Sequence, residues 1–227
     1  MIEIILLISA VLFIFALKLF GRPSTAHRAN SFAILAMGLA VFSAFNFDFS
    51  KYDSAFYITI VFSGLLGILI SKRVQMTQMP ELVGLFNGFG GGASGAIAYV
   101  ELSNTSLPIS DVFVAIFSMV IGVFTFSGSL IAVLKLRGKL NNFSTKLGNI
   151  FSVFLPTILI IPAVLEMDTF LYEFIILVAL IAGVIRVAVI GGADMPVVIA
   201  FLNSLSGIAA MSAGFIVNSI ILSWPAL

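Results

Sequence analysis

Two asparagines inside long apolar stretches are the residues of this sequence best suited to chemistry. Asn87 and Asn203 close the two copies of a repeat offset by 116 residues, in which MPELVGLFN at 79–87 recurs as MPVVIAFLN at 195–203. An amide cannot titrate at accessible pH, but it both donates and accepts hydrogen bonds. The pair is therefore suited to an ordered chain of water molecules that carries protons, provided that a titratable group lies nearby.

The repeat predicts two helices that run in the same direction. Each copy has a proline, Pro80 or Pro196, as its second residue, and proline is favoured at or near the first helical position because the missing N–H costs nothing there. At 1.5 Å per residue, each asparagine lies about 10 Å along its helix, so both amides are expected at the same depth and facing the bundle interior. Two interpretations stay open: interhelical hydrogen bonds of about 1 kcal/mol each, or part of a proton route.

Other polar residues surround this pair in the sequence. Ser129 and Thr125 are four residues apart and share one side of a predicted helix, although most intramembrane hydroxyls bond only to their own backbone. Glu81 and Asp194 lie where the two repeat helices begin, and a helix dipole stabilises carboxylates there. That stabilisation explains both acids structurally, and a gating or docking role is the second interpretation.

The glycines that follow Asn87 predict close helix contact. Gly84, Gly88 and Gly92 form a small-xxx-small ridge along one side of the helix expected over 80–100. The letters at 88–93 fit a loose dinucleotide fingerprint, but no strand precedes them. We therefore expect no nucleotide site and no bound cofactor in this chain.

The elements that carry these residues are predicted to be membrane helices. Hydrophobic residues make up 61% of the 227 and charged residues 9%, whereas about a quarter of a soluble domain is charged. The apolar runs are continuous and long enough to cross a hydrocarbon core of about 30 Å. The sequence predicts an all-α polytopic membrane protein with a C-terminal stub at 218–227 and about eight transmembrane helices, near 2–20, 32–49, 55–71, 80–100, 111–134, 147–165, 169–189 and 195–215.

The charges predict the orientation. With the N-terminus outside, alternating loops leave Lys51 as the one outer basic residue of eleven, as the positive-inside rule expects. The cluster from Lys135 to Lys146 is interpreted as a topology determinant, and His27 as a solvated residue of the first inner loop. The net charge of +1 makes nucleic acid an unexpected partner, and the absence of cysteine excludes disulfides and thiolate metal sites.

Three stretches resemble one family. MTQMPELVGLFNGFGGGASG at 76–95, FTFSGSLIAVLKLRGKL at 124–140 and IGGADMPVVIAFLNSLSG at 190–207 are similar to the membrane domain of the β subunit of proton-translocating NAD(P)+ transhydrogenase. The resemblance implies a bacterial cytoplasmic (inner) membrane protein that conducts protons and couples them to hydride transfer between NAD(H) and NADP(H). It assigns Asn203 and Ser129, with the position of Asn87, to the proton pathway, and it assigns Asp194 and Glu81 to the coupling region and the entrance.

The resemblance also implies partners. Many family members have histidine where Asn87 stands, and others have asparagine there with a histidine supplied by a helix of the α-type subunit. In the family, the β subunit continues through another helix into an NADP(H) domain, so this sequence is interpreted as truncated, split between genes or a domain fragment. A separate NADP(H) domain is expected if the gene is split, and the resemblance also implies a dimeric complex. A secondary transporter, or an inactive membrane remnant acting as a scaffold, remains an alternative.

Overall fold

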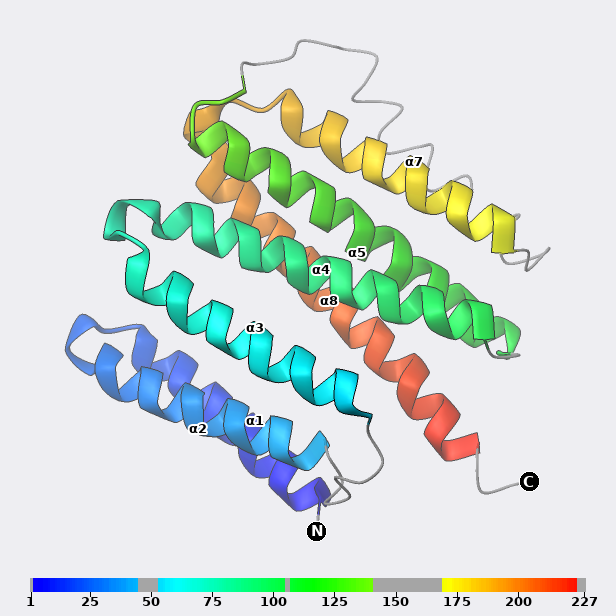
Figure 1. The fold of residues 1–227 in the computed structure, drawn as a ribbon, viewed down its shortest axis with the longest axis horizontal. Helices are drawn as coiled ribbons and strands as arrows, with labels where there is room; N and C mark the ends of the chain where they lie inside the picture. The colour runs from blue at the N-terminus through cyan, green and yellow to red at the C-terminus, as the bar shows by residue number, and fades with distance from the viewer. Residues whose placement is uncertain (1, 45–52, 105–106, 141–168, 224–227) are drawn as a thin grey trace. The chain divides into compact units, whose positions relative to one another are not determined.

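The described part of the chain is helical. The structure is a computed structural model that describes residues 2–44, 53–104, 107–140 and 169–223, with no strand in those ranges (Figure 1). The predicted all-helical fold class is therefore confirmed for these residues. The chain divides into two compact units, residues 1–73 and 74–227, which are described separately below.

The first unit contains three helices: α1 (Ile2–Phe20), α2 (Ala26–Ala44) and α3 (Ser54–Arg73). Helices α1 and α2 pack against each other, and the buried Ser9 hydroxyl donates to the Ala36 carbonyl at 2.7 Å. Phe15 and Phe32 add an edge-to-face contact with ring centroids 5.1 Å apart. Helix α3 has no buried residue.

The start of α2 corrects one expectation. The helix begins at Ala26, directly after the short turn Pro23–Thr25, so His27 and Arg28 lie in its first turn and not in a loop. The apolar pattern indicates where hydrocarbon begins, whereas a helix continues as long as its backbone hydrogen bonds allow. His27 was therefore placed on the wrong element.

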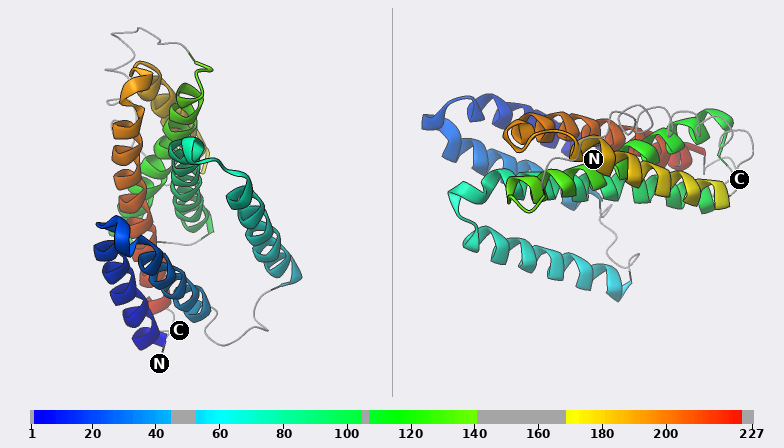
Figure 2. Two further views of the ribbon diagram at one scale, coloured as in Figure 1. Left: turned by 90° about the vertical axis from the view of Figure 1, so that its left-hand side faces the viewer. Right: turned by 90° about the horizontal axis from the view of Figure 1, so that it is seen from above.

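The described part of the second unit is built around α5 (Ile109–Leu136), which contacts the three other helices described there: α4 (Met79–Asn104), α7 (Thr169–Ala188) and α8 (Met195–Ser223). Helices α4 and α8 run in the same direction, and α5 and α7 run in the opposite one (Figures 1 and 2). The parallel direction predicted from the repeat is thus confirmed.

Two apolar clusters hold these helices together at different levels of α5. One gathers Ile116 and Met119 with Tyr172 of α7 and Ile216 of α8. The other gathers Ala132 with residues of α7 and α8: Val187, Met195, Ile199 and Leu202. In lipid the surroundings are as apolar as these side chains, so close packing rather than water exclusion stabilises the contacts.

Four described helices are long and apolar enough to cross a membrane: 54–73, 109–136, 170–188 and 192–217. Helix α1 offers a shorter apolar segment at 4–20. Helices α2 and α4 are less apolar, because they contain more glycine and polar residues, and they do not reach the hydropathy of the four spans. The expected span at 147–165 lies outside the described residues. The count of about eight spans is therefore not confirmed.

The end of α8 corrects a second expectation. Residues 218–223, expected as the beginning of another span, continue α8 as far as Ser223. No proline interrupts the sequence between Pro196 and Pro225, so nothing forces the backbone to leave the helix earlier.

Candidate functional site

A chain of three polar side chains, two of them buried and Ser206 partly buried, joins α4, α5 and α8. The Asn87 amide nitrogen donates to the Ser129 hydroxyl at 2.9 Å, and the Asn87 amide oxygen lies 2.6 Å from the Ser206 hydroxyl, which donates to it. Asn87 is 6% exposed and Ser129 is fully buried. The chain has a direction, because Ser206 donates to Asn87 and Asn87 donates to Ser129.

The glycine ridge of α4 lets this chain form. A Cβ added at Gly88 would lie 3.1 Å from the Ser129 Cβ, and one added at Gly84 would lie 3.0 Å from Val133 and 3.1 Å from Ile199. A larger residue at either position would require the neighbouring atoms of α5 or α8 to shift by a few tenths of an ångström or more. The predicted small-xxx-small contact therefore places α4 close enough for Asn87 to reach both neighbours.

Asn203 does not join this chain through its side chain. That side chain is exposed, although its backbone carbonyl accepts a hydrogen bond from Ser206 at 2.9 Å. Helix α8 packs through Ile199, Leu202 and Ser206, and Asn203 follows Leu202, which turns it about 100° around the helix. The matching depth follows from the parallel repeat, but the expectation that both amides face the interior of this chain was wrong for Asn203.

Ser206 is the member of the chain that sequence reasoning missed. It lies three residues beyond Asn203 in the second repeat copy, and the first copy has Gly90 at the equivalent position. A serine in an apolar helix usually bonds to its own backbone, so its type carries little signal. Only the packed structure reveals that its hydroxyl reaches another helix.

Thr125 extends the polar side of α5 by one turn from Ser129. It is fully buried, and its hydroxyl has no hydrogen-bond partner among the described residues. It packs on Gly91, one turn beyond Asn87 on α4, where an added Cβ would lie 3.0 Å from the Thr125 Cβ. A buried hydroxyl without a partner costs about 1–3 kcal/mol.

We expect Thr125→Val to leave the protein as stable as before or to stabilise it by about 1 kcal/mol, because valine keeps the shape and removes the unpaired hydroxyl. Thermal unfolding of the purified protein in detergent measures this, with Ser129→Ala as the comparison, since that change removes a paired hydroxyl and should lower the midpoint. A clear loss of stability in Thr125→Val would mean that the hydroxyl is paired in the membrane.

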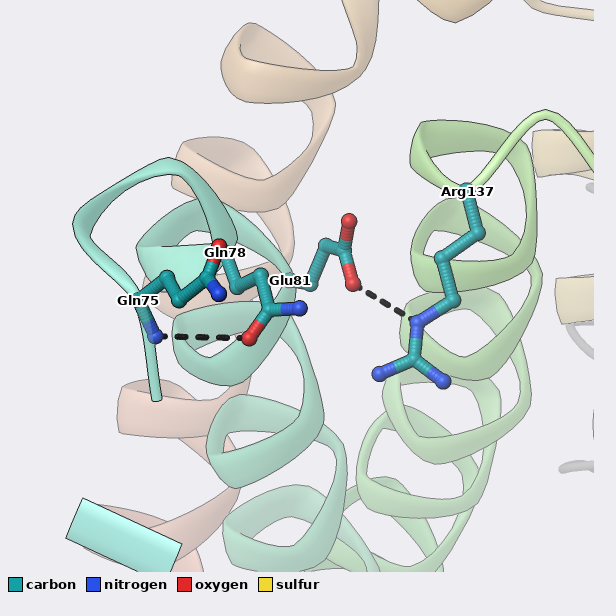
Figure 3. A network of polar contacts seen from close by, with 4 residues as sticks. All are labelled: Gln75, Gln78, Glu81 and Arg137. Atoms are coloured by element: carbon teal, nitrogen blue, oxygen red, sulfur yellow. Dashed lines mark hydrogen bonds and ion pairs between the residues drawn. The ribbon is translucent and has the colours of Figure 1, made fainter. Parts of the chain in front are cut away.

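An ion pair lies at the end of the second unit where α5 ends and α4 begins. Arg137, which caps α5, lies 2.6 Å from Glu81 in the first turn of α4, while Gln75 and Gln78 cap the turn that precedes it (Figure 3). Arg137 is half exposed, so the pair contributes about 0–1 kcal/mol. Its effect is to hold the end of α5 beside the start of α4.

Asp194 lies at the same end in a different setting. It ends the short turn Gly192–Asp194 before α8, its backbone N–H donates to the Gly191 carbonyl, and its side chain is exposed. The structure therefore places the two expected acids at two helix entrances and does not bring them together.

Lys135 stabilises this end of the unit from within. It is 5% exposed, and its ammonium donates to the backbone carbonyls of Ala188 and Ile190, at and just beyond the end of α7. The cluster from Lys135 to Lys146 was interpreted as a topology determinant, and residues 141–146 lie outside the described ranges. The Lys135 side chain makes internal contacts that this interpretation did not anticipate.

An apolar groove of about 580 Å³ lies between α4, α5 and α7, away from the polar chain. Its lining includes Phe89, Gly92 and Phe126, with Tyr99 donating to Glu173 at 3.2 Å. Because neither Asn87 nor Ser129 lines it, we place the candidate chemistry at the polar chain and not in the groove.

The fold and the apolar helices define the class of this protein: it is a helical membrane protein with a polar chain in its second unit. A model of the NAD(P) transhydrogenase beta subunit family matches residues 2–224, and the chain belongs to that family.

Two curated relatives agree with this assignment. The NAD(P) transhydrogenase subunit beta of Rhodospirillum rubrum is 30% identical over 92% of this chain and 48% of the relative. The sequence from a named strain of the same species matches with the same identity and coverage. The chain thus spans about half the length of the curated relatives that it matches.

Proposed function

We propose that this chain is the proton-conducting membrane part of a proton-translocating NAD(P)+ transhydrogenase. The observation that supports the proposal is the hydrogen-bonded chain from Ser206 through Asn87 to Ser129, because it connects α8 to α5 by polar side chains alone. Such a chain connects hydrogen-bond donors and acceptors from one helix to the next through the unit. Polar groups inside the hydrocarbon region are costly, so they are found mainly where they have a function. NAD(H) and NADP(H) then bind to other parts of the complex.

The chain needs a partner to conduct protons. Neither an amide nor a serine hydroxyl titrates at accessible pH, so a titratable group must come from elsewhere. Asn203 presents its amide on the exposed side of α8, next to Ser206, where lipid offers no hydrogen-bond partner. We place a membrane helix of the α-type subunit against this side, with its histidine completing the route from Asn203 to Asn87.

The assembled complex follows from the same proposal. It contains the α-type subunit, an NADP(H) domain and this membrane part, as a dimer in the bacterial cytoplasmic (inner) membrane. Asp194 and Glu81 mark the coupling region and the entrance, where movement of the NADP(H) domain would reach α8 and α4. The chain would act as an enzyme subunit and would not transfer hydride by itself.

Proton uptake into vesicles that contain the whole complex tests this function. NADPH and an oxidised NAD analogue drive the reaction, and we expect Asn87→Leu to lower uptake by about 5- to 100-fold, because it removes the central link between Ser206 and Ser129. Ser103→Ala on the same helix is the control, since Ser103 is exposed and, among the described residues, its hydroxyl bonds only to the Tyr99 carbonyl. Asn203→Leu should also abolish uptake.

Three results would contradict the proposal. Normal uptake in Asn87→Leu would exclude the polar chain from the proton route. Flux of a solute without nicotinamide nucleotides would indicate a secondary transporter. Nucleotide binding without any uptake by the unaltered complex would indicate a remnant that no longer couples the two processes.

A further inference from the structure

The Ser206 hydroxyl has two acceptors and one hydrogen. Its oxygen lies 2.6 Å from the Asn87 amide oxygen on α4 and 2.9 Å from the Asn203 carbonyl on its own helix. Both distances are hydrogen-bond distances, but a hydroxyl can donate only one of these bonds at a time. The two arrangements therefore exclude each other.

The choice between the acceptors decides whether the polar chain is continuous. When Ser206 donates to Asn87, the chain runs from α8 to Ser129 on α5 through the Asn87 amide. When Ser206 donates to Asn203, the Asn87 amide oxygen loses its donor and the chain ends at α4. One bond rotation in Ser206 thus separates a connected state from a disconnected one.

We infer that Ser206 is a positioning residue that connects and disconnects the proton chain as α8 shifts relative to α4. This inference rests on the proposed function. The Asn203 carbonyl moves with Ser206 because both belong to α8, whereas Asn87 belongs to α4. A shift of about 1 Å would lengthen only the bond to Asn87 beyond hydrogen-bond range, and the bond to Asn203 would then replace it.

The start of α8 offers the means to shift it. Ser206 lies eleven residues after Met195, which is about 16 Å along the helix, and no proline or described break intervenes. A displacement at the exposed Asp194 turn would therefore reach Ser206 along a continuous helix. The switch would respond to whatever contacts that turn.

Proton uptake per hydride transferred tests this inference in the whole complex. We expect Ser206→Ala to lower that ratio by about 3- to 20-fold, the range that one interhelical hydrogen bond of about 0.6–1.7 kcal/mol allows. Ser206→Thr keeps the hydroxyl and should restore it. Ser204→Ala, two residues away, should pump normally, because Ser204 is exposed and bonds only to the Ala200 carbonyl.

A double variant separates a switch from a merely structural role. If Ser206 acts through Asn87, Asn87→Leu combined with Ser206→Ala should pump no worse than Asn87→Leu alone. The inference would be overturned if the double variant pumped less than Asn87→Leu alone, with the losses of the two single variants multiplied. It would also be overturned if Ser206→Thr failed to restore the ratio while its thermal midpoint stayed normal. Normal pumping in Ser206→Ala with none in Asn87→Leu would overturn it and leave the proposed function standing, whereas normal pumping in both variants would remove the proposed function as well.

Discussion

Gly122→Ala is expected to force α4 away from α5 and to destabilise the second unit by about 3 kcal/mol or more. A Cβ at Gly122 would lie 2.5 Å from the Gly91 carbonyl oxygen and 2.7 Å from the Gly95 nitrogen. Both are backbone atoms of a continuous helix, so no side chain can rotate aside, and the cost lies at the upper end of overpacking effects or beyond it. Thermal unfolding of the purified protein in detergent measures the change.

Gly90→Ala is the matched control for this experiment. A Cβ at Gly90 meets no atom within 4 Å, and alanine is favoured over glycine inside a helix by about 1 kcal/mol. The two changes have the same chemistry and opposite expected signs. An unchanged or raised midpoint for Gly122→Ala would mean that α4 and α5 are farther apart than the structure has them.

The same substitution should affect the candidate site. Gly122 and Gly91 meet at the level of Thr125, one turn from the bond between Asn87 and Ser129. Separating the helices there would lengthen that bond, so Gly122→Ala should reduce proton uptake in parallel with stability. Close packing and the polar chain are therefore two consequences of the same glycine pattern.

The sequence predicted the parts of this site that depend on local spacing. Pro80 and Pro196 mark where the repeat helices start, and the glycine spacing from Gly84 indicates which side of α4 packs closely. Both features depend on residues a few positions apart in the chain. The shared direction of α4 and α8 follows from the repeat that contains the prolines, and the close packing of α4 follows from the glycines.

The parts that depend on contacts between distant residues could not be predicted. Asn87 and Asn203 match in the repeat, but α8 packs through Leu202 and Ser206, so one amide is buried and the other is exposed. The rotation of a helix about its own axis is set by its neighbours, and a wide apolar surface in a membrane helix does not specify it. Ser206 was missed for the same reason.

Lys135 is a second residue whose contacts with distant residues could not be predicted from the sequence. Its place in a basic cluster suggested a loop charge, yet it lies in the last turn of α5, and its side chain turns inward to two carbonyls more than fifty positions away in the sequence. The last carbonyls of any helix lack partners within that helix. Lysine supplies the missing donors for α7, and with them it fixes where the chain turns toward Asp194 and α8.

Lys135→Met is therefore expected to destabilise the second unit by about 2 kcal/mol or more. Methionine retains most of the length and packing of the side chain but cannot donate, which leaves the Ala188 and Ile190 carbonyls without their charged partner. The exposed Lys139, in the same basic segment, is the matched control, and Lys139→Met should leave the thermal midpoint unchanged. Equal midpoints for the two variants would show that Lys135 acts only as a topology charge. A loss of stability in Lys135→Met alone, together with weaker proton uptake, would show that Lys135 connects the end of α7 to the position of α8.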